Sequence, residues 1–85
     1  MATFPTLHLN GTSKTDLEQE YTAAYHAIGK AFDALAAATL NARDFYPQGA
    51  DAYCQARSER NVALDQLRDA QQYAGEMVAG IFDQL

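Results

Sequence analysis

Two long stretches of the chain carry apolar residues at helical spacing, three and four residues apart. The first stretch has the row Leu17, Tyr21, Ala24 or Tyr25, Ile28, Phe32 and Leu35. The second has the row Tyr53, Ala56, Arg60, Ala63, Leu67, Ala70, Ala74, Met77 and Ile81, widened by Leu64, Val78, Phe82 and Leu85. The pattern predicts an all-α fold, in which helices over about residues 14–40 and 51–85 form a long antiparallel hairpin.

Residues at both ends of the first stretch fit helix caps. Ser13 is a good N-cap, and Asp16 follows three residues later as a short form of the capping box. Asn41 fits a left-handed C-cap. Residues 41–50 then form a connector with loop chemistry, because Pro47 ends any helix before it.

The segment before the first helix, residues 1–13, reads as an extended N-terminal arm. Pro5 disfavours a helix around it, and Asn10 followed by Gly11 is a strong turn signal. An arm that carries Phe4, Leu7 and Leu9 is too apolar to stay in solvent, so we expect it to pack across the domain or onto a neighbouring subunit.

The composition of the chain provides few large apolar residues, which disfavours a stable monomer. The chain has 85 residues, of which 17 are alanine and only 16 are Leu, Ile, Val or Phe. A single domain of this size has little core to bury. We therefore expect a homo-oligomer, with a dimer that completes a four-helix bundle as the first choice and higher cyclic states as alternatives. Gly29, Gly75 and Gly80 fall inside the predicted helices, where close packing or simple surface tolerance would explain them.

Charge and cysteine content exclude several classes of protein. The net charge is −5, which argues against direct nucleic-acid binding and against binding to anionic membranes. No segment is apolar enough to span a membrane, and no signal peptide is evident, so a cytoplasmic protein is expected. Cys54 is the only cysteine, which allows no intramolecular disulfide and is predicted to be a buried structural thiol.

Catalytic and metal-binding motifs are absent from the sequence. There is no phosphate-binding glycine loop, nucleophile elbow or paired-histidine zinc spacing, and His8 and His26 are far apart. We therefore predict a protein that is not an enzyme and that uses no cofactor or metal.

The connector and the start of the second helix hold the strongest candidate binding site. Its predicted residues are Arg43, Tyr46, Tyr53, Arg57 and Arg60. Arginine binds phosphate in a bidentate manner and tyrosine stacks on bases, so this cluster would suit a nucleotide-like anion. The alternative is a purely structural hairpin tip, in which Arg57 or Arg60 pairs with Asp33 or Glu59. A different candidate surface is the acidic end of the second helix, with Asp69, Glu76 and Asp83, which would suit a basic protein partner.

The segments LHLNGTS (residues 7–13) and NARDFYPQ (residues 41–48) resemble parts of small helical-hairpin accessory proteins of tailed phages and prophages. The resemblance implies a viral protein in the host cytoplasm that blocks host defence, by sequestering a nucleotide signal or by occupying a host protein. It also allows a structural subunit of a virion or its assembly. The leading hypothesis is a non-enzymatic oligomeric anti-defence protein that sequesters a nucleotide-like ligand; the alternative is an acidic protein–protein inhibitor or nucleic-acid mimic.

Overall fold

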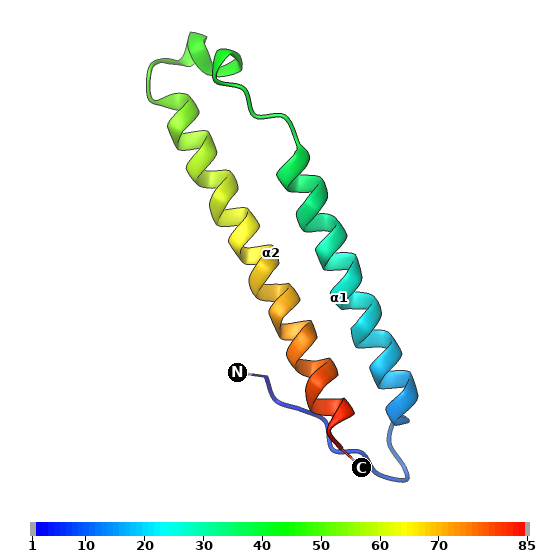
Figure 1. Cartoon of the computed structure of the whole chain (residues 1–85). Coiled ribbons are helices and arrows are strands. Elements are labelled where there is room, and N and C mark those ends of the chain that lie inside the picture. The colour runs from blue at the N-terminus through cyan, green and yellow to red at the C-terminus, as the bar shows by residue number, and fades with distance from the viewer. Residues whose placement is uncertain (1, 85) are drawn as a thin grey trace.

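Two long helices and a short 3-10 helix make up the computed structural model, which describes residues 2–84 (Figure 1). They are α1 (Lys14–Ala37), η1 (Ala42–Gln48) and α2 (Ala52–Phe82). The long helices lie antiparallel in a rod of 62 × 20 × 17 Å, with η1 at the tip. The predicted all-α hairpin is confirmed within the described residues, which contain no strand. The first residue of the predicted arm, Met1, and the last of the predicted second helix, Leu85, lie outside them.

The N-cap predicted for α1 is confirmed. Ser13 has an extended backbone, with φ −65° and ψ 152°, and its Oγ accepts a hydrogen bond from the backbone N–H of Asp16 at 3.1 Å. This bond satisfies one of the free N–H groups of the first turn.

The C-cap predicted for α1 is wrong, because the helix stops before Asn41. Its C-cap is Ala38, which has extended backbone angles, and Asn41 instead is the N-cap of η1, with φ −100°. Among residues 2–84 only Gly49 has a positive φ. The carbonyl of Ala38 accepts a hydrogen bond from Nη1 of Arg60 at 3.0 Å. A long-range contact from α2 therefore satisfies the end of α1, and no left-handed residue is used.

The connector is more regular than a loop. Ala42–Gln48 form a 3-10 helix that includes Pro47, which we expected to end a helix. The fixed φ of proline is compatible with helical backbone, and this short helix ends one residue after Pro47, so it loses only the one N–H bond that proline lacks. Gly49 then turns the chain with φ 114°, and α2 begins after Asp51.

The buried part of the molecule is small and lies near the end of α2. Ala74, Met77 and Ile81 are the only buried residues in the range 2–84, and Ile81 is 0% exposed. The other positions of the two predicted apolar rows are mostly half-buried, because each faces a single partner helix. Ala70 is exposed.

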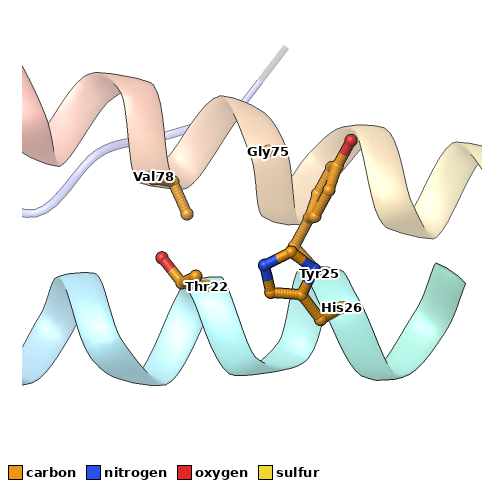
Figure 2. Close-up of a pocket in the computed structure, with 5 residues that line it drawn as sticks. All are labelled: Thr22, Tyr25, His26, Gly75 and Val78. Carbon is orange, nitrogen blue, oxygen red and sulfur yellow. The ribbon is translucent and has the colours of Figure 1, made fainter. Parts of the chain in front are cut away.

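Two glycines of α2 allow close approach of aromatic rings. A Cβ atom at Gly80 would lie 2.5 Å from the ring of Phe4, and one at Gly75 would lie 3.1 Å from the ring of Tyr25 (Figure 2). The packing explanation for these glycines is therefore confirmed.

The N-terminal arm packs across the end of α2. This is the first of the two expected arrangements, packing across the domain or onto a neighbouring subunit. Besides the contact of Phe4 with Gly80, the side chain of Gln84 binds the arm twice. Its Oε1 accepts from the N–H of Leu7 at 3.1 Å, and its Nε2 donates to the carbonyl of Pro5 at 2.7 Å. Leu9 lies at the turn that follows and is 99% exposed.

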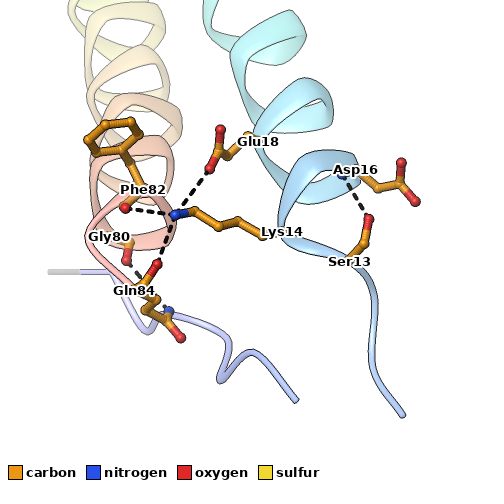
Figure 3. A network of polar contacts seen from close by, with 7 residues as sticks. All are labelled: Ser13, Lys14, Asp16, Glu18, Gly80, Phe82 and Gln84. Atoms are coloured by element: carbon orange, nitrogen blue, oxygen red, sulfur yellow. Dashed lines mark hydrogen bonds and ion pairs between the residues drawn. The ribbon is translucent and has the colours of Figure 1, made fainter. Parts of the chain in front are cut away.

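Lys14 joins the start of α1 to the end of α2 (Figure 3). Its Nζ donates to the carbonyls of Phe82 at 3.1 Å and Gln84 at 2.8 Å, and lies 3.8 Å from Oε1 of Glu18. A cation at a helix C-terminus is stabilised by the partial negative charge of the last carbonyls. Lys14 therefore binds the carbonyls at the end of α2, as Arg60 binds the carbonyl at the end of α1.

Candidate functional site

The structure brings two of the five predicted tip residues into contact. Tyr53 and Arg57 lie one turn apart on α2, and the guanidinium carbon of Arg57 is 5.6 Å from the centre of the Tyr53 ring. Phe45 of η1 also lies beside that ring, with the two ring centres 6.2 Å apart. A cation at this distance from an aromatic ring is held by the ring quadrupole. Tyr53 thus positions Arg57 at the tip.

Arg60 was predicted to share a face with Tyr53 and Arg57, but its guanidinium reaches the backbone of α1. Nη1 binds the Ala38 carbonyl, and Nε is buried without a hydrogen-bond partner among the described residues. Arg60 lies on the apolar seam between the helices, where a charge is costly unless it is paired. These contacts give Arg60 a structural role in the hairpin, and its role in ligand binding stays a prediction.

Arg43 and Tyr46 lie on η1 and are exposed, with Tyr46 71% exposed. Neither Arg43 nor Arg57 forms an ion pair with any acid in residues 2–84. The pairs expected for a purely structural tip, in which Arg57 or Arg60 binds Asp33 or Glu59, are not formed there either.

The hollow at the tip is not formed by the predicted residues. It has a volume of about 260 Å³ and is lined by Phe45, Gln48, Ala52, Gln55, Ala56 and Glu59. The carboxylate of Glu59 makes this hollow unfavourable for an anion. An anion at the tip would therefore bind on the open surface around Arg57.

A groove between α1 and α2 was not found from the sequence. It has a volume of about 320 Å³ and is lined by Thr22, Tyr25, His26, Gly75 and Val78 (Figure 2); we call it the Tyr25 groove. The ring of His26 meets that of Tyr25 edge-on, with centres 5.6 Å apart. The sequence signals for it were weak: Gly75 lies inside a predicted helix, and Tyr25 competes with Ala24 for a place in the apolar row of the other helix.

The acidic candidate surface is partly assembled beside the arm. Asp69 and Glu76 line a hollow of about 220 Å³ together with Ala2, Gln72 and Tyr73. Asp83 does not line it. Nearby, the pKa of Tyr21 is raised above its usual 10.0, first by the charge of Tyr73 and then by burial.

Other predicted features are simple to place. Cys54 is exposed, so the prediction of a buried thiol is wrong; it follows Tyr53 on α2, where the tip leaves one side of the helix uncovered. Arg68 pairs with Asp65 at 3.5 Å on an exposed surface. Within residues 2–84 no three His, Cys, Asp or Glu side chains are placed to hold a metal ion. No helix in this range is long and apolar enough to cross a membrane.

Comparisons of the chain with protein-family models, curated proteins and solved structures found no match. The resemblance to phage accessory proteins therefore stays a prediction.

Proposed function

We propose that this chain is a non-enzymatic binding protein that works as a homo-oligomer and takes a nucleotide-like anion at its hairpin tip. Support for the oligomer comes from the small core, with three buried residues among 2–84. Large apolar side chains remain exposed, including Tyr25 at 39% and Phe82 at 66%. Such side chains are commonly covered when hairpins associate into bundles.

Support for the anion comes from Arg57, which is held on the ring of Tyr53 and has no acidic partner in the described residues. The exposed Arg43 and Tyr46 add charge and a stacking surface on η1. A guanidinium that is positioned but unpaired can bind a phosphate through two N–H groups. Sequestration of a nucleotide signal against host defence would be one use of this site, as the resemblance implies.

Mass measurement tests both parts of the proposal. Native mass spectrometry of the freshly purified protein is expected to show a multiple of the 9.3 kDa chain mass. Excess mass that disappears on denaturation would identify the class of a captured ligand. A chain that stays monomeric would contradict the oligomer.

The tip itself is tested by an arginine pair that the chain provides. Arg68 lies 5.2 Å from the ring of Phe32, much as Arg57 lies on Tyr53, but Arg68 is paired with Asp65. Titrations with AMP and inorganic phosphate should show that Arg57→Ala weakens binding about tenfold or more, whereas Arg68→Ala leaves it unchanged. Equal affinities for both variants and the unmodified chain would contradict the site.

A second candidate function is the binding of a basic protein at the acidic hollow beside the arm. The observation that favours it is the joint lining of that hollow by Asp69 and Glu76, with no basic residue among its lining. A lysine-rich peptide should then bind in a salt-sensitive manner, and the change of Asp69, Glu76 and Asp83 to their amides should weaken it. Binding that is unaffected by these changes would exclude this surface.

A further inference from the structure

The two sides of the hairpin differ in what covers them. The arm lies over one side of α2, where Phe4 contacts Gly80 and Ala2 lies beside Tyr73. Gly75 is two residues from Tyr73, which is about 200° around a helix, so it faces the other side. The Tyr25 groove opens on that other side, which the arm leaves uncovered.

An exposed aromatic side chain lies next to the groove along α2. Phe82 lies one turn after Val78 on α2 and is 66% exposed, and Tyr25 is 39% exposed. Beside it lies the pair formed by Lys14 and Glu18, with Lys14 Nζ 5.4 Å from the Phe82 ring. An apolar centre that contains tyrosine and has a charged rim is typical of protein interfaces.

The chain exposes more surface than a compact monomer of its mass, in part because two helices form a rod, and this surface is large enough for a protein partner. A compact monomer of 9.3 kDa is expected to expose about 5,000 Å², whereas this chain exposes 6305 Å². The excess of about 1,300 Å² exceeds the roughly 800 Å² that each partner buries in a standard interface.

We propose that a second copy of this chain docks over the Tyr25 groove and the adjoining Phe82. This inference rests on the proposed self-association and specifies its surface. Charge permits a copy of the same chain on this side, because Lys14 and Glu18 pair with each other within one chain and so add no net repulsion between copies. Asp69 and Glu76, which would repel each other between copies of a chain with net charge −5, line the hollow beside the arm instead.

The test is sedimentation equilibrium of the full chain and of three variants over a wide concentration range. Tyr25→Glu and Thr22→Arg place a charge in the groove, and Thr22→Arg also serves if Tyr25→Glu fails to fold by circular dichroism. Val62→Glu is the matched control, because Val62 is an exposed apolar residue of α2 that does not line the groove. We expect both groove variants to raise the dissociation constant about tenfold or more, and the control to leave it unchanged.

The possible failures are distinguishable. If the unmodified chain associates but the folded groove variants associate equally well, the docking surface is wrong and self-association stands. If the unmodified chain remains monomeric up to millimolar concentration, the proposed oligomer fails and this inference fails with it, leaving the groove to a partner of another kind.

Discussion

Among the described residues 2–84, the three buried side chains all lie at the end of the rod where α1 begins and α2 ends, and the hairpin tip contains none. At the first end, the arm covers α2 through Phe4, and Gln84 holds the arm by two hydrogen bonds. At the tip, η1 packs on α2 through Phe45 and Tyr53, and Tyr46 stays in solvent. The terminal end is therefore held both by apolar burial and by the hydrogen bonds of Gln84 and Lys14, whereas the tip is held by half-buried packing and the single hydrogen bond of Arg60.

One device is common to both ends. The last carbonyls of each long helix bind a basic side chain of the other helix, Lys14 for α2 and Arg60 for α1. Two of the six basic residues are used in this way. Their role is to close the hairpin, which leaves Arg43 and Arg57 as the basic residues available at the tip.

The largest expected effect belongs to the core at the terminal end. Ile81→Ala should lower the free energy of unfolding by about 2–5 kcal/mol, because it removes a fully covered side chain and leaves a cavity. Urea denaturation followed by circular dichroism measures this loss. Val62→Ala, at a 57% exposed position of the same helix, should change stability by less than about 0.5 kcal/mol. Equal losses at the two positions would break the contrast between covered and exposed parts of the rod.

A smaller effect is expected for the polar contact near the tip. Arg60→Met keeps much of the side-chain stem and removes the bond to the Ala38 carbonyl, so it should cost about 1 kcal/mol. Hydrogen exchange should quicken mainly in the last turn of α1. Arg57→Met is the control, since Arg57 contacts Tyr53 and should leave that turn protected. The assignment of Arg60 to the helix end would be wrong if both changes affected α1 alike.

The smallest effect concerns pH. The pKa of Tyr21 is raised in the folded chain by Tyr73 and by burial, so the unfolded chain releases this proton at a lower pH. The stability that depends on protonated Tyr21 is therefore present below pH 10.0 and is lost as pH rises through the folded pKa. Urea midpoints compared from about pH 8 to about pH 11 should fall less for Tyr21→Phe than for the unmodified chain. If the urea midpoints of both proteins fell equally, the interaction of Tyr21 with Tyr73 would not contribute to folding stability.

The parts of the fold that depend on neighbouring residues in the sequence were predictable. Ser13 caps α1 through a bond to a residue three positions away, and helical spacing identified the row from Leu17 to Leu35. The end of α1 was not predictable in the same way. The carbonyl of Ala38 there binds Arg60, which lies 22 residues further along the chain, and the residues around Ala38 do not predict such a long-range hydrogen bond.

In the candidate sites too, contacts within one helix were predictable and contacts between the helices were not. Spacing alone placed Tyr53 and Arg57 together, because residues four apart on a helix are neighbours. It could not show that Arg60 turns to α1, since that depends on how the helices are aligned along one another. The Tyr25 groove depends on the same alignment, which brings residue 25 opposite residue 75.

The central claim is that a single hairpin is incomplete and gains stability from a second copy. The most direct test is the thermal unfolding midpoint of the unmodified chain over a dilution of about 100-fold, because association with the folded state alone makes that midpoint depend on concentration. The account predicts a midpoint that rises with concentration. A midpoint that is identical at every concentration, with a monomer mass throughout, would contradict it.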